Sequence, residues 1–278
     1  MIELLRSLHT HGALLRDFVR RDLKARYVGS SMGFFWSLVF PVISLCVYMF
    51  VFRTILATRW GDNQPPAQTA LTMLAGISVW TAFAETLSRS TNCLVENSNL
   101  IQKVVFPSEI LPPYLSISAL VNMCIGLAIV LVGCVLIDAD PAAGWKLAFQ
   151  PERLSGALVV LPLLMFVQCV FTIGLGYLLA TLNLYLRDTY HVIGVATMVW
   201  MFATPIFYPA FIVEMRGYGW ILDLNPMYWL IEAYRAVIVE AHWPDWKALA
   251  RFLAASCAVF ALGSSFFWSQ RRKLPDLL

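Results

Sequence analysis

Residues 16–52 read RDFVRRDLKARYVGSSMGFFWSLVFPVISLCVYMFVF, and this stretch decides how the chain meets its solvent. Its first part predicts a basic amphipathic helix, because Leu15, Val19 and Leu23 recur every fourth residue. Such a helix lies in a membrane interface, with its cations among anionic headgroups. A Gly/Ser turn follows, and the uncharged run 34–52 is nineteen residues long. At roughly 1.5 Å per residue, that run can cross a hydrocarbon core of about 30 Å.

The composition is that of an integral membrane protein. Of the 278 residues, 59% are hydrophobic and 13% are charged, whereas ordinary soluble domains carry about 25% charged residues. The mean hydropathy is +0.70. We predict a single all-α membrane domain over 1–278. It divides into an interfacial helix and turn (1–32), a six-helix bundle (33–270) and a tail (271–278).

Six apolar runs predict six transmembrane helices. They cover 34–52, 63–84 with a helix start near Gln68, 110–137, 154–186, 189–213 with a helix end near Pro205 to Pro209, and 252–270. The fourth run is longer than one crossing needs, so we expect a long or Pro162-bent helix there. Uninterrupted runs of this length exclude a barrel, whose strands alternate in hydrophobicity.

The distribution of lysine and arginine predicts the orientation. Six of them precede the first span, and three follow the last span. The connections after the second and fourth spans hold Arg89, Lys103 and Arg187. The other three connections carry eight cations over a longer total length. The positive-inside rule therefore places both termini and these two connections in the cytoplasm.

The two inner connections predict contact points. The first, NCLVENSNLIQKVVFPSEILPP (92–113), is too polar to span and too apolar for a free loop. It predicts a short amphipathic helix that ends at Phe106-Pro107 and either docks in a cleft of a soluble partner or rests on the membrane. The second, LNLYLRDTYHV, carries the charged dipeptide Arg187-Asp188 at a tight turn. It predicts a second docking point.

The outer segment between the fifth and sixth spans predicts another amphipathic helix. Apolar residues follow i, i+3, i+4, i+7 spacing from Met227, so Pro226 starts a helix whose other face carries Glu232 and Arg235. This helix is too short and too charged to cross. Together with 206–215 it predicts a re-entrant pair, which is tolerated where protein or a watery cavity covers the backbone. A gate or vestibule cap is the expected role.

Other side chains allow two interpretations each. Glu85 precedes Arg89 by one helical turn, an order that favours an ion pair and a structural role over a functional one. Aromatic residues make up 14% of the chain. They form interfacial belts, or some of them face a pore and stack on sugar rings. The six cysteines are scattered without a close pair, which favours helix packing over disulfides or metal binding.

Several motifs are missing from the sequence. No G-x-x-x-x-G-K-[ST] loop occurs, so the chain does not hydrolyse ATP through a P-loop. No H-E-x-x-H or nucleophile elbow occurs, and the centres of the spans are almost free of the ionisable residues that coupled carriers use. A chain of this kind is expected to take its energy from a partner.

Four ordered segments resemble the permeases of ABC transporters that export bacterial polysaccharides, such as O-antigen, capsule and teichoic acid. They are RDLKARYVGSSMGFFWSLVFPV, ENSNLIQKVVFPSEILP, LNLYLRD and TPIFYP…LNPMYWLIEAYR. The resemblance implies a type 2 ABC exporter fold. It also implies two permease copies around a continuous canal, two ATPase subunits on separate chains, and a lipid-linked glycan as substrate.

The same resemblance implies roles for particular residues. Those expected to contact the ATPase are Glu96, Asn99, Leu100, Lys103, Phe106, Pro107, Arg187 and Asp188. Those expected where the anionic lipid headgroup enters are Arg20, Arg21, Lys24, Arg26, Tyr27 and Ser30. The suggested canal aromatics are Trp36, Tyr48, Trp80 and Trp200. The expected outer gate is formed by Phe207, Tyr208, Tyr228 and Trp229.

The resulting prediction is a multi-pass permease of a bacterial inner membrane, a homodimer without catalytic residues, metal or cofactor of its own. ATP and Mg are expected on the partner ATPase, and no nucleic acid is expected to bind. One alternative is an ABC exporter of drugs or small lipids with the same fold. The others are a polyprenyl-lipid-dependent membrane transferase, which would need paired acids at a cytosolic face, and a secondary carrier.

Overall fold

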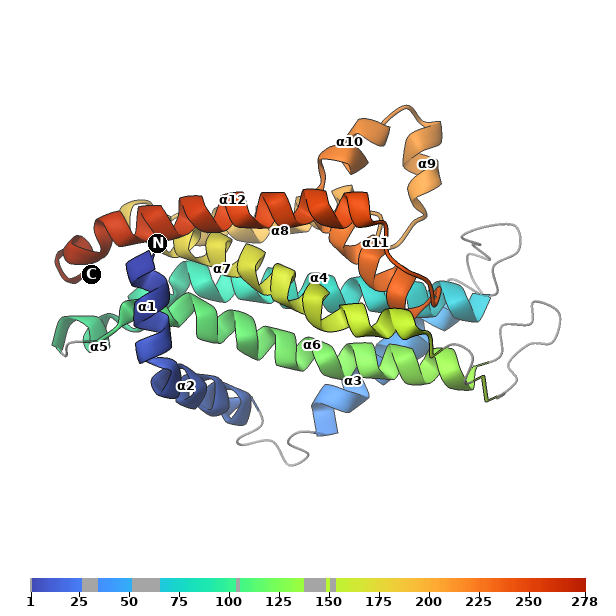
Figure 1. Cartoon of the computed structure of the whole chain (residues 1–278), viewed down its shortest axis with the longest axis horizontal. Coiled ribbons are helices and arrows are strands. Elements are labelled where there is room, and N and C mark those ends of the chain that lie inside the picture. The colour runs from blue at the N-terminus through green and yellow to red at the C-terminus, as the bar shows by residue number, and fades with distance from the viewer. Residues whose placement is uncertain (1, 27–34, 52–65, 104–105, 138–148, 151–153) are drawn as a thin grey trace.

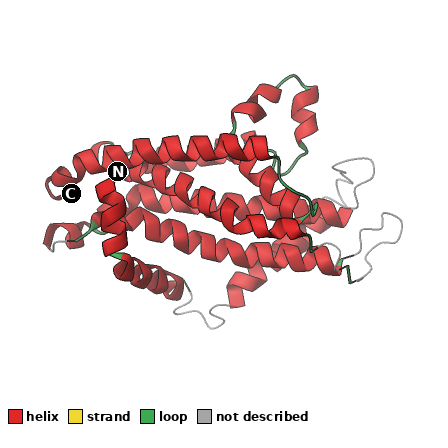
Figure 2. Cartoon of the chain, viewed as in Figure 1, coloured by secondary structure: helices red, strands yellow, loops and turns green. Residues whose placement is uncertain are grey.

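A computed structural model describes residues 2–26, 35–51, 66–103, 106–137, 149–150 and 154–278, and its elements are helical (Figure 2). Four long helices run side by side: α4 (Pro66–Glu96), α6 (Leu111–Leu136), α7 (Leu161–Tyr185) and α12 (Trp246–Gln270) (Figure 1). Two shorter apolar helices, α3 (Phe35–Met49) and α8 (Thr189–Ala203), lie against α4. The other described helices are α1 (Ile2–Thr10), α2 (Gly12–Ala25), α5 (Ser98–Lys103), α9 (Ala210–Met215), α10 (Gly219–Leu224), α11 (Pro226–Ile238) and α13 (Leu274–Leu277). Three short 3-10 helices are η2 (Ser108–Ile110), η4 (Gly156–Val160) and η5 (Arg271–Lys273).

Four described segments are long and apolar enough to cross a membrane. They are Gln68–Glu96, Ser108–Leu136, Gly156–Tyr185 and Trp246–Gln270, which correspond to the second, third, fourth and sixth expected spans. The helices α3 and α8 have 15 residues each, fewer than the roughly 20 that a perpendicular crossing needs. The count of six crossings stays a prediction, in which α3 and α8 are the first and fifth.

The bundle has two distinct ends. Both chain termini, α1, α5 and the turn between α7 and α8 lie at one end, which we call the termini end (Figure 1). The helices α9 and α10 form a hairpin that projects from the side of the bundle near the other end, which we call the hairpin end (Figure 1). Both termini at one end agree with an even number of crossings.

Several helix boundaries differ from the sequence prediction. The second span was expected to end at Ala84, but α4 continues to Glu96. Glu85 and Arg89 on this extension are paired with each other, so their charges do not end the helix. The fifth span was expected to end near Pro205 to Pro209, and α8 stops at Ala203, just before Pro205, because a residue ahead of proline disfavours helical backbone.

Of the two forms expected for the fourth span, the long one is confirmed over Gly156–Tyr185, whereas the start of α12 was wrongly predicted. Pro162 does not bend a helix. It lies in the first turn of α7, where its missing N–H removes no helical hydrogen bond. The last span begins at Trp246 rather than Phe252, because the Asp245 carboxylate accepts the Lys247 backbone N–H at 2.8 Å and caps the helix.

Close packing of α7 on α12 depends on two glycines. A Cβ added to Gly263 would lie 2.0 Å from the backbone oxygen of Gly174. Small residues at such a crossing let two membrane helices approach closely and gain dispersion contacts. A main hydrophobic core fills the bundle around α4. A second core at the termini end joins the following buried residues: Leu4, Phe18, Cys93, Leu94, Ile101, Ile110, Leu111, Leu115, Tyr177, Ala180, Phe267 and Leu274.

Candidate functional site

The first inner connection forms a short exposed helix at the termini end. Residues of α5 and its flanks that point to solvent are Glu96, Asn99, Leu100 and Lys103. Ile101, on the opposite side of α5, is buried in the second core. Phe106 and Pro107 are half-buried and lead into η2. The predicted amphipathic helix is confirmed, and its polar side is free to meet a partner.

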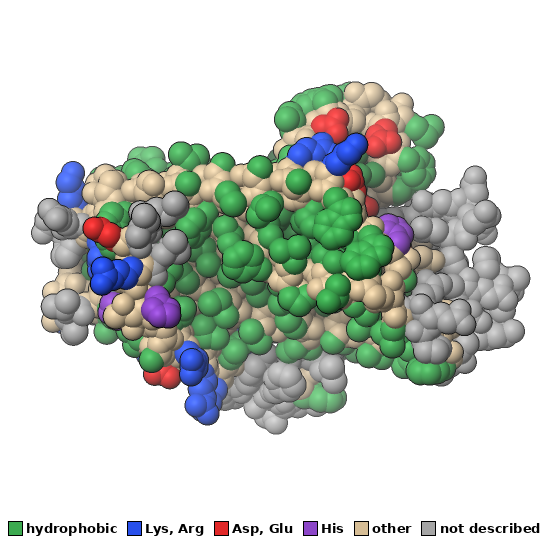
Figure 3. Space-filling view, in the orientation of Figure 1, with side chains coloured by type: hydrophobic (Ala, Val, Ile, Leu, Met, Phe, Trp, Pro, Cys, Tyr) green, Lys and Arg blue, Asp and Glu red, His purple; other side chains and the backbone are tan. Residues whose placement is uncertain are grey.

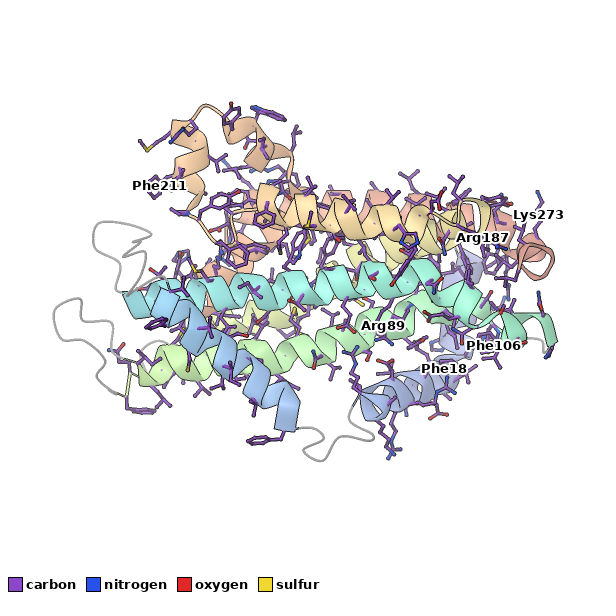
Figure 4. All side chains as sticks on the ribbon, turned by 180° about the vertical axis from the view of Figure 1, so that it is seen from behind. Phe18, Arg89, Phe106, Arg187, Phe211 and Lys273 are labelled. Atoms are coloured by element: carbon purple, nitrogen blue, oxygen red, sulfur yellow. The ribbon has the colours of Figure 1, made fainter. Side chains whose placement is uncertain are left out.

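The second inner connection is an exposed turn at the same end. Arg187 and Asp188 are both exposed between α7 and α8, and neither forms an ion pair within the described part of the chain. Thr189 closes the turn by donating to the Leu186 carbonyl at 2.5 Å. Figure 4 labels Arg187 at the end that also carries Phe106 and Lys273. The two predicted docking points are therefore on one face of the molecule, although about 80 residues separate them in the chain.

The amphipathic helix α2 is attached to this end through Phe18. The Phe18 ring packs against Phe106 at 5.7 Å and Tyr114 at 5.3 Å between ring centroids (Figure 4). Of the expected apolar stripe, Leu15, Val19 and Leu23 are half-buried, and Phe18 is the buried member. The helix thus packs on α6 and on the first inner connection rather than resting on lipid alone.

A four-charge network joins α2 to the bundle. Asp22 and Arg26 of α2 pair with Arg89 and Glu85 of α4, and the Ser118 hydroxyl of α6 donates to Asp22. Burial alone would raise the pKa of Asp22, but hydrogen bonds from Arg89 and Ser118 outweigh it and lower the pKa below its ordinary value. The predicted Glu85–Arg89 pair is confirmed at 3.1 Å, and its partners on α2 hold the helix in place.

The remaining cations of α2 form an open basic surface. Arg20, Arg21, Lys24 and Asp17 line an open depression of about 620 Å³ together with Ala25. The Arg21 guanidinium lies 4.5 Å from the centroid of the Phe18 ring, which restricts its position. Figure 3 shows basic side chains over α2 and apolar side chains over the middle of the bundle.

The six residues predicted at the headgroup site fall into three groups in the structure. Arg20, Arg21 and Lys24 are exposed together, whereas Arg26 is engaged in the four-charge network. Tyr27 and Ser30 lie outside the described residues.

At the hairpin end, a buried arginine holds the broken end of α8. Arg235 of α11 is 1% exposed. Its guanidinium donates to the backbone oxygens of Pro205 at 2.9 Å, Ile206 at 3.1 Å and Thr72 at 3.2 Å, and it pairs with Glu232 at 2.6 Å. Two of these carbonyls belong to the non-helical segment after α8 and the third lies within α4, so Arg235 joins that segment to the bundle.

The placement of Arg235 corrects the sequence prediction, which assigned it to the polar outer face of its helix. A glycine on α4 makes room for it, since a Cβ at Gly76 would lie 2.8 Å from Arg235 Nη2. The start of α11 at Pro226 is confirmed, with the Asn225 side chain capping it through the Met227 N–H at 3.1 Å.

The helices of the two segments expected to form a re-entrant pair do not pack on each other. α11 was expected to pair with 206–215, but α9 contacts α10, and α11 instead packs between α4, α7 and α12. The nearly continuous burial of α11 explains this, because its polar residues find partners inside the bundle. α9 has no buried residue and exposes Phe211 (Figure 4).

The four residues of the expected outer gate lie around the base of this hairpin. Phe207 packs on the main core, and the Tyr208 hydroxyl donates to the Phe202 carbonyl at 2.5 Å. Trp229 packs against the main core and carries the Arg251 guanidinium 5.2 Å from its ring centroid. Tyr228 is half-buried.

Two of the suggested canal aromatics are packed inside the chain. Trp80 is 4% exposed and meets Trp200 edge-on at 6.2 Å between ring centroids. The Trp200 indole N–H donates to Asn225 Oδ1 at 2.9 Å. Both rings therefore join α4, α8 and α11 in this conformation, and their place along a canal stays a prediction. Trp36 and Tyr48 lie on α3, and their side chains are outside the described set.

Comparison with known proteins assigns the family. The family model for ABC-2 type transporters matches residues 14–239, which run from α2 to the end of α11. The chain belongs to the ABC-2 type transporter family. The O-antigen export system permease protein RfbA of Myxococcus xanthus is 30% identical over 277 residues, 99% of each chain. Two proteins of the same name from Klebsiella pneumoniae are each 25% identical over 227 residues, 82% of this chain and 80% of theirs.

Membership of the ABC-2 family confirms the resemblance seen in the four sequence segments. It also confirms that the chain is a transport component, which sets aside the transferase and the secondary carrier. A permease of an ABC export system works with a separate ATPase, so the missing P-loop is explained.

Two buried charges escaped prediction in this ABC-2 protein. Arg235 and Glu109 are the only Asp, Glu, Lys or Arg side chains that are buried among the described residues. Arg235 could have been recognised as unusual, because it is the only arginine in α11, a helix of mostly apolar residues. For Glu109, the available signal was a carboxylate between two proline-containing turns at the start of a span.

Proposed function

We propose that this chain is the transmembrane permease of an ATP-driven ABC exporter that moves a lipid-linked polysaccharide of the O-antigen or capsule type across a bacterial inner membrane. The observation that carries the proposal is the 30% identity with an O-antigen export permease along 99% of both chains. The two exposed inner connections at one end of the bundle support it, since they offer an ATPase two contact points next to the ends of long helices.

The proposed assembly contains two copies of this chain and two ATPase subunits that bind ATP and Mg. The termini end faces the cytosol in this arrangement, supported by the excess of lysine and arginine there. The exposed apolar face of α8 supports the presence of a second copy, because these long apolar side chains point away from the hydrophobic core of their own chain. The exposed ones are Val192, Val195, Met198, Val199 and Phe202. A polysaccharide canal would form between two such copies, with α9 and α10 near its outer mouth.

The basic surface of α2 is the proposed place where the lipid-linked substrate enters. A phosphate or pyrophosphate that joins lipid to glycan carries negative charge at the level of the membrane interface. Arg20, Arg21 and Lys24 meet it at that level, each adding about 1 kcal/mol of attraction to an anionic headgroup. The four-charge network keeps these cations at a fixed position beside the bundle.

Replacing Arg20, Arg21 and Lys24 together with alanine is expected to weaken the apparent affinity for the lipid-linked substrate about 100-fold, since about 3 kcal/mol of attraction is lost. The measurement is export into vesicles that contain the permease and its ATPase, at increasing concentrations of a lipid diphosphate with a short sugar chain. Thermal unfolding should change little, because the three side chains are exposed.

Arg16→Ala is the matched control. Arg16 is exposed on the same helix but does not line the depression, so its replacement should leave the apparent affinity within about threefold of wild type. Wild-type affinity in the triple variant would contradict the proposed headgroup site.

A further inference from the structure

A fully buried acidic side chain lies within the first inner connection, at the termini end. Glu109 lies in η2, in the last part of the first inner connection and just before α6, and its side chain is 0% exposed. It is the only buried acidic side chain in the part of the chain that the structure describes. A buried carboxylate is costly unless it is paired and hydrogen-bonded, so its partners constrain the fold around it.

The partners of Glu109 come from three distant segments. Its Oε1 accepts from the Ser7 hydroxyl of α1 and from Arg271 Nη2 of η5, the latter at 3.0 Å. Its backbone oxygen accepts from the Tyr177 hydroxyl of α7 at 2.6 Å. Its Oε2 is buried and has no hydrogen-bond partner among the described residues. One residue of the inner connection therefore ties both chain ends to the bundle.

Further contacts link those chain ends to each other and to α5. The Trp268 indole N–H donates to Glu3 Oε2 at 3.1 Å, and Arg271 lies 4.6 Å from the centroid of the Trp268 ring. The tail helix α13 packs against α5, with Leu274 buried in the second core, which also includes Ile101. The side of α5 that faces away from solvent thus rests partly on the C-terminal tail.

We propose that Glu109 is a positioning residue for energy coupling: through Ser7 and Arg271 it joins α1 and the C-terminal tail to the first inner connection, so that α5 transmits a push to the bundle. This inference rests on the proposed function. Without these contacts of Glu109, the C-terminal tail that packs on α5 would not be held in place. A force on α5 would then only tilt this short helix. With the tie, the force reaches α6 through η2 and α12 through η5, because each 3-10 turn continues directly into a long helix.

Arg271→Ala tests the tie without a large change of the core, since the Arg271 side chain is 38% exposed. In vesicles that contain the permease and its ATPase, the variant should still assemble and hydrolyse ATP. The amount of glycan exported per ATP hydrolysed should fall about fivefold or more, the range typical of energetic coupling between sites. Lys273→Ala is the control. Lys273 is an exposed cation two residues further on, outside the ion pairs of the described residues, and its replacement should leave that ratio unchanged.

The double variant Glu109→Gln/Arg271→Ala separates positioning from simple stabilisation. Glutamine removes the buried charge that Arg271→Ala leaves unpaired, so thermal stability should return toward wild type. Because the tie remains broken, export per ATP should stay low. If the double variant recovers export together with stability, or if Arg271→Ala exports normally, the inference is wrong. A wild-type complex that hydrolyses ATP but exports no glycan would instead overturn the proposed function, and this inference with it.

Discussion

Arg235→Ala is expected to lower the free energy of unfolding by about 3 kcal/mol or more. The substitution removes the donors to three backbone carbonyls and leaves a cavity where a large buried side chain was. Since two of these carbonyls belong to the segment between α8 and α9, the hairpin should detach before the rest of the bundle unfolds. The measurement is thermal unfolding of the purified permease in detergent.

Two further variants test whether the lost guanidinium donors cause this destabilisation. Arg235→Lys should also destabilise, because an ammonium group cannot direct separate N–H donors toward Pro205, Ile206 and Thr72 at once. Arg251→Ala removes an exposed cation that contacts Trp229 at the same end, and it should cost no more than about 1 kcal/mol. A wild-type unfolding midpoint for Arg235→Ala would show that the carbonyls find other partners.

Reversing the charges at both inner connections, with Lys103→Glu and Arg187→Glu, is expected to reduce export at least tenfold. Both side chains are exposed at the termini end, and opposite charge on a docking surface costs more than about 1.4 kcal/mol, which corresponds to that factor. The permease itself should fold normally, because exposed substitutions change stability by roughly 0.5 kcal/mol or less. Export and ATP hydrolysis are measured together in reconstituted vesicles.

Lys247→Glu provides the matched control for this charge reversal. Lys247 is an exposed cation in the first turn of α12, at the hairpin end. Its reversal should leave export close to wild type. Normal export by the double reversal at Lys103 and Arg187 would remove these connections from the ATPase interface.

Much of the fold was predictable because it follows from local patterns. Apolar runs identified the four long helices, and proline with helical spacing identified the start of α11. The spacing of Glu85 and Arg89 also predicted their ion pair. Each of these features depends on residues within a few helical turns of one another.

The features that were missed depend on distant partners. Arg235 has the local pattern of a polar outer face, but the carbonyls that require it come from Thr72 and from the end of α8. Asp22 and Arg26 look like part of a solvated basic face, yet they meet Glu85 and Arg89 of a later helix. A sequence pattern can mark a charge as unusual, but only the folded chain brings the opposite charge beside it.

The central claim is that this permease moves a lipid-linked glycan only when an ATPase acts on its termini end. The most direct measurement reconstitutes the permease in vesicles with and without the ATPase, and follows transport of a labelled lipid-linked glycan with and without ATP. The account predicts transport only when the ATPase and ATP are both present. Transport by the permease alone, without nucleotide, would contradict it.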